Sequence, residues 1–325
     1  MSQSLLILSS GGDAPGMNAA IRAAVRYGIH HGYKMQASLQ GYQGLINQQL
    51  IPLSHETVAN CIQRGGTILK TARCEAFKQS EVQAQCRAFL QQQGITAIIV
   101  LGGNGSFQGA RKLTENTDIQ LIGIPCTIDN DIPGTDYCIG FDTACNTALQ
   151  AIDHIRDTAL SHDRHFLVEV MGRASGFLAL EVGLAGGAEF IITPEYPVTP
   201  QEVVDTLKRQ QREKLTSIIV NAEADRPGHS MQLAQTIYEI SGIEYKTCIL
   251  GHTQRGGTPT LRDRRMATLM GAHAVQAIMD GETEKMTAHI NGHIQTTAIP
   301  SSDNATEYLT RQDLLQLNAV VCGIA

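Results

Sequence analysis

The sequence predicts an α/β protein in which parallel sheets carry helices on both faces. Short apolar runs, typical of buried strands, alternate with helix-like segments almost throughout the chain. Glycine-rich turns follow two of these runs, at Gly11-Gly12 and at Gly102-Gly103. The length of 325 residues fits about two domains. In such folds ligands bind at the carboxyl ends of the strands, so the loops that follow the apolar runs are the first candidates for function.

Each expected element follows from a local signal. Apolar runs predict strands at Leu5–Ser9, Ala97–Leu101, Ile119–Ile124, Phe166–Met171, Phe190–Ile192, Ser217–Asn221 and Lys246–Leu250. A capping residue followed by proline opens a helix at Thr199-Pro200. Further helices are expected at Pro15–His31, Ser80–Gln93, Ser106–Asn116, Phe141–Leu160, Ser175–Ala185, His229–Ser241 and Leu261–Met279. No linker rich in Pro, Gly or Ser marks a domain border, and the tail after Ala298 is more polar than the rest.

Composition excludes several classes of function. The net charge is −6 and no long basic run occurs, which disfavours nucleic acid as the main partner. The apolar stretches are too short to cross a bilayer, and the first residues lack the basic region of a signal peptide. The eight cysteines form no CxxC pair and no zinc-binding spacing, so free thiols in a reducing cytoplasm are the simplest interpretation.

Two glycine-rich loops are candidates for a phosphate cradle. Ser9–Gly16 and Gly102–Ser106 each join an expected strand to an expected helix. Glycines at such a junction let backbone N–H groups approach a phosphate closely. A lone Gly-Gly pair is more often a tight turn, but here the arrangement occurs twice. Neither loop matches the Walker A or the GxGxxG pattern, so the P-loop and Rossmann interpretations are disfavoured.

The segment Thr127–Asp131 offers two carboxylates after the next strand. Asp129 or Asp131 could accept a hydroxyl proton while the other carboxylate holds Mg²⁺. A pair of turn-forming aspartates is the alternative, and it would be favoured if the segment stood alone. A phosphate cradle combined with carboxylates suggests phosphoryl transfer.

Basic side chains recur in loops and at strand ends, namely Arg73, Arg164, Arg173, Lys246 and Arg255. Most surface arginines are merely solvated, but Arg173 and Arg255 adjoin glycines, which suits bidentate binding of a phosphate. His252 could donate to the same ligand, although a lone histidine is more often structural.

Taken together, these motifs resemble bacterial 6-phosphofructokinases of phosphofructokinase family A. The matching strings are SSGGDAPGMNAAIR, RGGTxLxTAR, GGxGS, PxTIDNDIxGTDxxIGFDTA, SHxR, VEVMGR and LGHxQRGGxPxxxDR, and they extend almost to residue 265 in the family's order. The resemblance implies two αβα sandwich domains with mainly parallel sheets. Residues 1–140 plus 253–304 would bind the nucleotide, and residues 141–252 plus 305–325 would bind the sugar phosphate.

The resemblance also implies an activity: Mg²⁺-dependent transfer of a phosphoryl group from ATP to the 1-hydroxyl of fructose 6-phosphate, by a cytoplasmic homotetramer. Asp129 would be the catalytic base, Thr127 would bond the transferring phosphoryl, and Arg173 would stabilise its charge. The nucleotide would be held by Gly12, Arg73, Cys74, Gly103, Asn104, Gly105 and Ser106. The sugar phosphate would contact Thr127, Asp129, Met171, Gly172, Arg173, Glu223, His252 and Arg255. Arg164 and Lys246 would reach it from a neighbouring subunit.

Three departures from the family pattern bear on function. Asn104 stands where the family has a metal-binding Asp, so Asn104 and Asp131 form the expected metal site with one charge fewer. Lys246 replaces an Arg, which keeps the charge but loses the bidentate fork. The third concerns a site for an ADP-type effector: expected partners Arg22, Arg26, Arg156, Glu189 and Lys214 are present, whereas His55, Ala59 and Asn60 replace polar or charged residues.

Donor choice depends on Gly105 and Cys126. Pyrophosphate-using relatives commonly carry Asp at the first position and Lys at the second, and that Asp would crowd and repel an α-phosphate. Gly105 leaves the space open, so ATP is the expected donor. A pyrophosphate-dependent enzyme is one alternative, and a catalytically weakened regulatory or ligand-binding homologue, suggested by Asn104, is the other.

Overall fold

The computed structural model describes residues 3–210, 216–223, 229–301 and 312–323. The chain forms two compact units. The first comprises the described parts of Met1–Thr127, Asp131–Thr143 and Arg255–Glu307; the second comprises those of Ile128–Asn130, Ala144–Gln254 and Tyr308–Ala325. In this division Ile128–Asn130 falls with the second unit, where Ser175 Oγ donates to the backbone oxygen of Asp129 at 2.9 Å.

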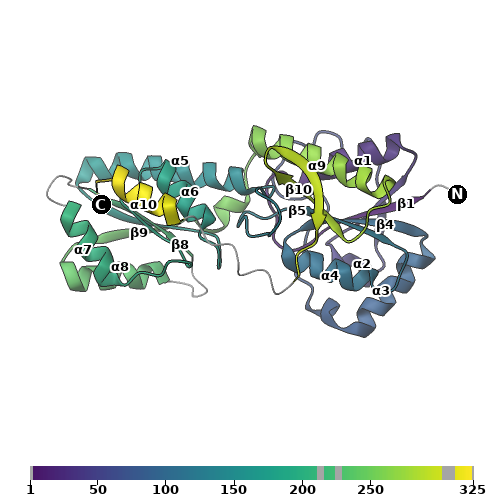
Figure 1. The fold of residues 1–325 in the computed structure, drawn as a ribbon, viewed down its shortest axis with the longest axis horizontal. Coiled ribbons are helices and arrows are strands. Elements are labelled where there is room, and N and C mark those ends of the chain that lie inside the picture. The colour runs from purple at the N-terminus through teal and green to yellow at the C-terminus, as the bar shows by residue number, and fades with distance from the viewer. Residues whose placement is uncertain (1–2, 211–215, 224–228, 302–311, 324–325) are drawn as a thin grey trace. The chain divides into compact units, whose positions relative to one another are not determined.

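A seven-stranded sheet forms the centre of the first unit, in the order β11-β10-β5-β4-β1-β2-β3 (Figure 1). Its strands are β1 (Ser4–Ser9), β2 (Lys34–Ser38), β3 (Leu50–Pro52), β4 (Ile95–Gly102), β5 (Gln120–Pro125), β10 (Lys285–Ile290) and β11 (His293–Ala298). Neighbours pair in parallel except at the two edges, where β3 runs antiparallel to β2 and β11 runs antiparallel to β10. The α/β class predicted from the alternation is confirmed.

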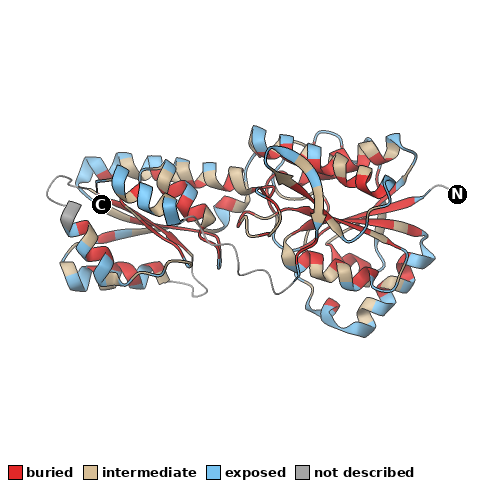
Figure 2. Cartoon of the chain, viewed as in Figure 1, coloured by how far each residue is buried: buried red, intermediate tan, exposed pale blue. Residues whose placement is uncertain are grey.

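Helices cover both faces of this sheet (Figure 1). On one face lie α1 (Met17–His30) and α9 (Leu261–Met279); on the other lie α2 (Tyr42–Ile46), α3 (Ser80–Gln92) and α4 (Asn104–Thr114), with a 3₁₀ turn, η1, at Glu75–Lys78. Because both faces are covered, the central strands are buried along nearly their whole length (Figure 2). Every residue of β1 is buried, which explains why the strand reads as a continuous apolar run rather than an alternating one.

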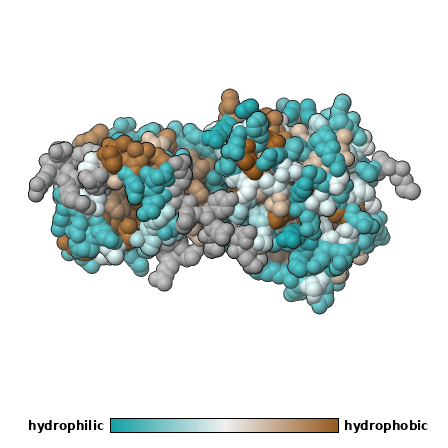
Figure 3. Space-filling model, in the orientation of Figure 1, coloured by the Kyte–Doolittle hydropathy of each residue, from teal (hydrophilic) through white to brown (hydrophobic). Residues whose placement is uncertain are grey.

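The second unit has a smaller, fully parallel sheet of four strands in the order β7-β8-β6-β9. Its strands are β6 (His165–Val170), β7 (Phe190–Ile192), β8 (Ile218–Ala222) and β9 (Tyr245–Ile249). The helices are α5 (Phe141–His162), α6 (Phe177–Ala185), α7 (Pro200–Gln210), α8 (His229–Ser241) and α10 (Gln312–Val321), and η2 is a 3₁₀ turn at Gly251–Arg255. Side chains of α10 at Leu317, Val320 and Val321 are exposed and form an apolar patch (Figure 3).

Asp263 is a buried carboxylate at the start of α9, and it fixes the segment that leads into α5. Its Oδ1 accepts from the Tyr137 hydroxyl at 2.6 Å and from the Gly140 N–H at 2.7 Å. Its Oδ2 accepts from the N–H of Thr143 at 2.8 Å and from the hydroxyl of the same residue. Gly140 has a φ of +105°, and a Cβ there would lie 2.6 Å from Ala14 Cβ, so only glycine fits this turn.

None of the helices in the described part of the chain is both long enough and apolar enough to span a membrane.

Candidate active site

The two glycine-rich loops lie next to each other at one edge of the first unit's sheet. Strands β1 and β4 are parallel neighbours with Ser9 opposite Leu101, and the Ser10 N–H donates to Leu101 O at 3.0 Å. Both loops therefore start at carboxyl ends of adjacent strands, where α/β proteins bind ligands. A Cβ on Gly102 would lie 2.6 Å from Ser10 O, so the close approach of the loops requires glycine there.

Helix α4 begins at Asn104, two residues earlier than the sequence suggests, with Gly103 as its N-cap. Its first turn thus contains three of the expected nucleotide-binding residues, Asn104, Gly105 and Ser106. No side chain caps this helix end, and unpaired N–H groups at a helix start favour an anion. A Cβ on Gly103 or on Gly105 would meet nothing within 4 Å, so the space beside this turn is open.

The other expected nucleotide contacts line the same edge. Thr71 Oγ1 donates to Gly11 O at 2.7 Å, which brings the segment carrying Arg73 and Cys74 to the first loop. Arg73 is exposed, and Cys74 Sγ contacts Gln43 Oε1 at 3.5 Å. Arg255 also belongs to this unit: its guanidinium lies against the loop, where a Cβ on Gly12 would come within 2.3 Å of Nη1.

Tyr42 is a buried side chain at this edge that the sequence interpretation missed. Its hydroxyl donates to the backbone oxygen of Ser106, and its ring stacks on Phe77 with centroids 4.2 Å apart. The contact anchors the first turn of α4 against α2. Tyr42 belongs to none of the matched motifs, so no motif in the sequence indicated this residue.

The carboxylate segment follows β5, the next strand in the sheet. The Cys126 N–H donates to Gly102 O at 3.0 Å, which places the segment beside the second loop. Thr127 and Asp131 belong to the first unit and are half-buried, whereas Asp129 belongs to the second unit and is only 4% exposed. The chain thus enters and leaves the second unit within five residues.

The described residues hold no cluster of three or more His, Cys, Asp or Glu side chains that could bind a metal ion by itself. Mg²⁺ usually binds through one or two carboxylates plus substrate phosphates and water. Asp131 supplies suitable oxygens, so this residue fits a magnesium ion that arrives with a nucleotide. Asn104 fits less well, because its Oδ1 already accepts a hydrogen bond from Gln108.

In the second unit, expected sugar-phosphate residues gather at the carboxyl ends of β6 and β8. Met171, Gly172 and Arg173 follow β6, and Glu223 follows β8. The Arg173 N–H donates to Glu223 Oε1 at 3.3 Å, and the Glu223 N–H donates to Val170 O at 2.7 Å. Gly172 has a φ of +143°, and a Cβ there would lie 2.3 Å from Ser175 O. His252 is exposed on η2, after β9.

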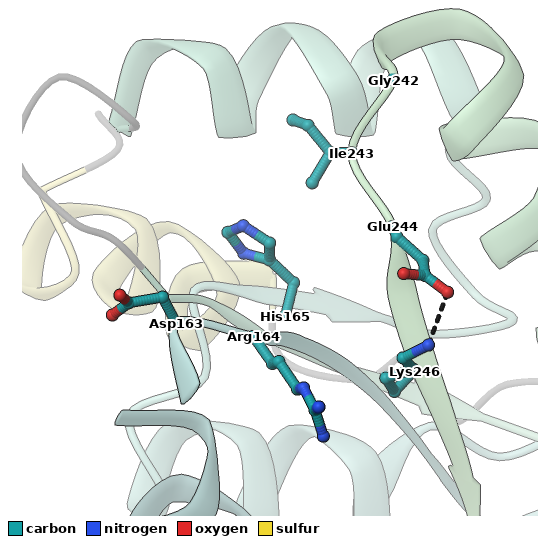
Figure 4. A pocket seen from close by; sticks show the side chains of 7 residues that line it. All are labelled: Asp163, Arg164, His165, Gly242, Ile243, Glu244 and Lys246. Atoms are coloured by element: carbon teal, nitrogen blue, oxygen red, sulfur yellow. Dashed lines mark hydrogen bonds and ion pairs between the residues drawn. The ribbon is translucent and has the colours of Figure 1, made fainter. Parts of the chain in front are cut away.

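Arg164 and Lys246 lie at the other end of that sheet, at the amino ends of its strands. They sit at the starts of β6 and β9, where Phe166 pairs with Lys246. Both line a pocket of about 400 Å³, together with Asp163, His165, Gly242, Ile243 and Glu244 (Figure 4). Strand β6 has six residues at roughly 3.3 Å each, so these cations lie on the order of 17–20 Å from the residues after β6. The structure does not bring the two groups together within one chain.

The pocket's charges are partly paired. Lys246 Nζ forms an ion pair with Glu244 at 2.5 Å, as Figure 4 shows. Behind Arg164, His165 Nδ1 lies 2.8 Å from Ser217 Oγ, which in turn lies 2.6 Å from the Tyr245 hydroxyl. Burial lowers the pKa of His165, and the charge of Glu189 opposes that shift. Sequence reasoning missed this network, although two of its members directly adjoin Arg164 and Lys246.

The expected effector residues are distributed over both units. In the first unit, Arg22 and Arg26 lie one turn apart on α1, and Arg26 donates to His55 O at 3.4 Å. In the second unit, Arg156 donates to Gly186 O and Gly187 O at 2.6 and 2.8 Å. Its guanidinium lies 3.9 Å from Glu189, whose other oxygen accepts from the Ile218 N–H. Lys214 lies outside the described residues.

Comparisons with known proteins agree with this arrangement. The family model described as Phosphofructokinase matches residues 4–278. A curated ATP-dependent 6-phosphofructokinase of Coxiella burnetii is 58% identical over 320 residues, which cover 98% of this chain and 98% of the relative. The ATP-dependent 6-phosphofructokinase 1 of Thermus thermophilus is 48% identical over 316 residues, covering 97% of this chain and 98% of that protein.

Solved structures match over nearly the whole chain. Phosphofructokinase from Saccharomyces cerevisiae has a TM-score of 0.83 at 33% identity, and the match covers 99% of this chain but 47% of the yeast chain. The T-state enzyme of Pichia pastoris gives a TM-score of 0.86 at 32% identity, covering 99% and 38%. This chain therefore spans less than half of either yeast chain. A pyrophosphate-dependent phosphofructokinase from Marinobacter aquaeolei, at 22% identity and a TM-score of 0.82 over 97% of this chain and 91% of that one, shows a shared fold.

Proposed function

The chain belongs to the phosphofructokinase family, and we propose that it transfers the terminal phosphoryl group of ATP to the 1-hydroxyl of fructose 6-phosphate. The products are fructose 1,6-bisphosphate and ADP. The observation that carries the proposal is the meeting of two glycine-rich loops and a carboxylate segment at the ends of β1, β4 and β5. The ends of these strands offer backbone N–H groups for phosphates, and the segment that follows β5 carries the carboxylate proposed for the acceptor hydroxyl.

In the proposed reaction Asp129 accepts the proton of the 1-hydroxyl. The oxygen of that hydroxyl forms a bond to the γ-phosphorus, and the bond between this phosphorus and the β–γ bridging oxygen breaks, which releases ADP. Thr127 would bond the transferring group, and Arg173 would offset its negative charge. A magnesium ion held by Asp131 and the phosphates would neutralise charge on the β- and γ-oxygens.

The domain roles remain those expected from the resemblance. The first unit would bind the nucleotide through Gly12, Gly103, Gly105 and their neighbours. The second unit would bind the sugar phosphate through Met171, Gly172, Glu223 and His252. Arg255, which belongs to the first unit, is also expected from the resemblance to contact the sugar phosphate.

ATP is the donor that the site supports. Open space beside Gly105 leaves room for an α-phosphate, as an ATP-binding site requires. Pyrophosphate is not favoured as the donor. The weakened regulatory homologue is disfavoured as well, because Thr127, Asp129 and Arg173 are all present.

We also propose a homotetramer in which substrate sites are shared between subunits. Arg164 and Lys246 lie at the amino ends of the strands, and Arg173 and Glu223 lie beyond the carboxyl ends. Both pairs of residues can therefore bind one sugar phosphate only if a second copy of the chain supplies one of the pairs. An ADP-type effector would bind through Arg22, Arg26, Arg156 and Glu189, and it would act modestly because Arg156 is already engaged by backbone oxygens. Cytoplasmic location suits eight free cysteines.

A coupled assay tests the proposed function. Purified protein is given fructose 6-phosphate and Mg²⁺ with either ATP or pyrophosphate, and formation of fructose 1,6-bisphosphate is followed. We expect turnover with ATP. Turnover with pyrophosphate alone would show that the donor is wrong, and no turnover with either donor would favour the regulatory homologue. Sedimentation of the same sample tests the tetramer.

A further inference from the structure

Asn104 is held in a defined orientation by a residue one turn further along α4. Gln108 Nε2 lies 3.0 Å from Asn104 Oδ1 and 2.6 Å from the backbone oxygen of Pro300. All three residues belong to the first unit. The side chain of Gln108 therefore bridges the start of α4 and the segment that follows β11.

Hydrogen-bonding chemistry determines the orientation of the side-chain amides of Gln108 and Asn104. The oxygen of Pro300 can only accept, so the atom of Gln108 beside it must be the NH₂ nitrogen. That nitrogen donates its other hydrogen to Asn104, so the Asn104 atom facing Gln108 must be the oxygen. The NH₂ group of Asn104 therefore points away from Gln108, and within the described part of the chain nothing accepts its hydrogens.

We propose that Asn104 donates a hydrogen bond to the phosphate chain of the nucleotide, and that Gln108 is the positioning residue that holds it in this orientation. The inference rests on the proposed function, which puts the nucleotide at the start of α4. An amide NH₂ has no free lone pair and cannot coordinate Mg²⁺. It adds instead to the N–H groups at the helix start, which already favour an anion.

This assignment changes what the departure from the family pattern means. A carboxylate at residue 104 would repel a phosphate unless a cation lay between them. The amide attracts the phosphate directly and needs no cation. Metal-free ATP should therefore bind this protein more tightly than it binds a protein with Asp at residue 104, which would place one more carboxylate beside the phosphates.

Calorimetric titration tests the proposal without turnover. ATP in EDTA and ATP in excess Mg²⁺ are each titrated, without fructose 6-phosphate, into the unmodified protein and into Asn104→Asp and Gln108→Met. The control is Asn47→Asp, because Gln43 donates to Asn47 in the same way, one turn apart on exposed surface. Melting curves verify that each variant is folded, and Gln108→Met adds no charge, so it tests the proposal even if Asn104→Asp does not fold.

We expect the unmodified protein to bind ATP both with and without the metal. Asn104→Asp should weaken metal-free binding roughly ten- to a hundredfold, the usual loss for a hydrogen bond to a charged group, while changing Mg-ATP binding little. Gln108→Met should weaken metal-free binding several-fold, and Asn47→Asp should leave both affinities unchanged. Equal affinities for metal-free ATP in the unmodified protein and Asn104→Asp would overturn the donor role. Unchanged binding in Gln108→Met would overturn the positioning role.

The titrations and the activity assay together distinguish failure of the proposed function from failure of this inference. If the unmodified protein shows the expected binding pattern but does not phosphorylate fructose 6-phosphate, the donor role holds and the proposed activity is wrong. If it phosphorylates fructose 6-phosphate while Asn104→Asp binds metal-free ATP as tightly, only this inference is wrong. No binding of ATP in either buffer would refute both.

Discussion

Asp263 is expected to be a sensitive position for the stability of the first unit. In Asp263→Asn one carboxylate oxygen becomes an NH₂ group, which can only donate. Each oxygen of Asp263 accepts from one backbone N–H, that of Gly140 or that of Thr143, and from one hydroxyl. The hydroxyls of Tyr137 and Thr143 can rotate and accept instead, but a backbone N–H cannot. Either orientation of Asn therefore leaves one buried N–H facing a donor.

The cost follows from these bonds. A hydrogen bond to a charged group contributes about 1.5–3 kcal/mol, and an unsatisfied buried donor costs about 1–3 kcal/mol. Part of this lost free energy is recovered, because Asn carries no buried charge. Burial already raises the pKa of Asp263 and so opposes its ionisation. We expect a net loss of about 2–4 kcal/mol in the free energy of unfolding, which lowers Tm by roughly 5–15 °C.

Differential scanning calorimetry measures this loss. Asp280→Asn is the matched control, because Asp280 is the C-cap of the same helix and its side chain accepts from Gln276 on exposed surface. Its Tm should stay within about 2 °C of the unmodified protein, since surface substitutions usually change stability by less than 0.5 kcal/mol. If Asp263→Asn melts together with Asp280→Asn, the hydrogen bonds of Asp263 do not stabilise the crossing into α5, and the reasoning is refuted.

Three further outcomes are expected. Asp129→Ser should lower kcat about 10²–10⁴-fold with fructose 6-phosphate still bound in a titration, and near-normal kcat would exclude Asp129 as the base. Gly105→Asp should leave Tm unchanged, because a Cβ there meets open space, yet raise the KM for ATP; a large drop in Tm would mean that the space is not open. His165 has a pKa lowered by burial, so the native protein binds fewer protons than the unfolded chain between that pKa and about 6.5. Stability should fall as the pH falls below about 6.5, and His165→Phe should remove part of that dependence in melting curves; an identical pH profile would contradict this.

The central strands β1, β4 and β5 of the first unit's sheet were predicted, and the strands outside them in that sheet were not. Strands β1, β4 and β5 are buried on both faces, so their sequences are apolar throughout. Strand β2 was missed because it buries polar side chains: Gln36 is 7% exposed and donates to Ser4 Oγ, which no local pattern reveals. The β10–β11 hairpin could have been predicted, because Asn-Gly at residues 291 and 292 is the dipeptide that type I′ hairpin turns favour, and both residues have positive φ in the structure.

The candidate site likewise has parts that the sequence predicts and parts that it does not. Residue types and their places in the chain indicated the glycine loops and the carboxylate segment. The orientation of Asn104 could not be predicted, because it depends on the backbone of Pro300, 192 residues from Gln108. The network of His165, Ser217 and Tyr245 likewise joins three separate strand starts, and its residues belong to no motif.

The pairing of β5 with β10 has a consequence for how the protein is made. Ile122 of β5 lies opposite Lys285, so one side of β5 stays without its partner until roughly 160 further residues have left the ribosome. At about 5–20 residues per second, that wait lasts roughly 8–30 s. During this time an apolar strand exposes unpaired backbone groups, which is the type of edge that recruits other chains. The nascent protein should therefore need a chaperone over this interval, and slow translation should increase its aggregation.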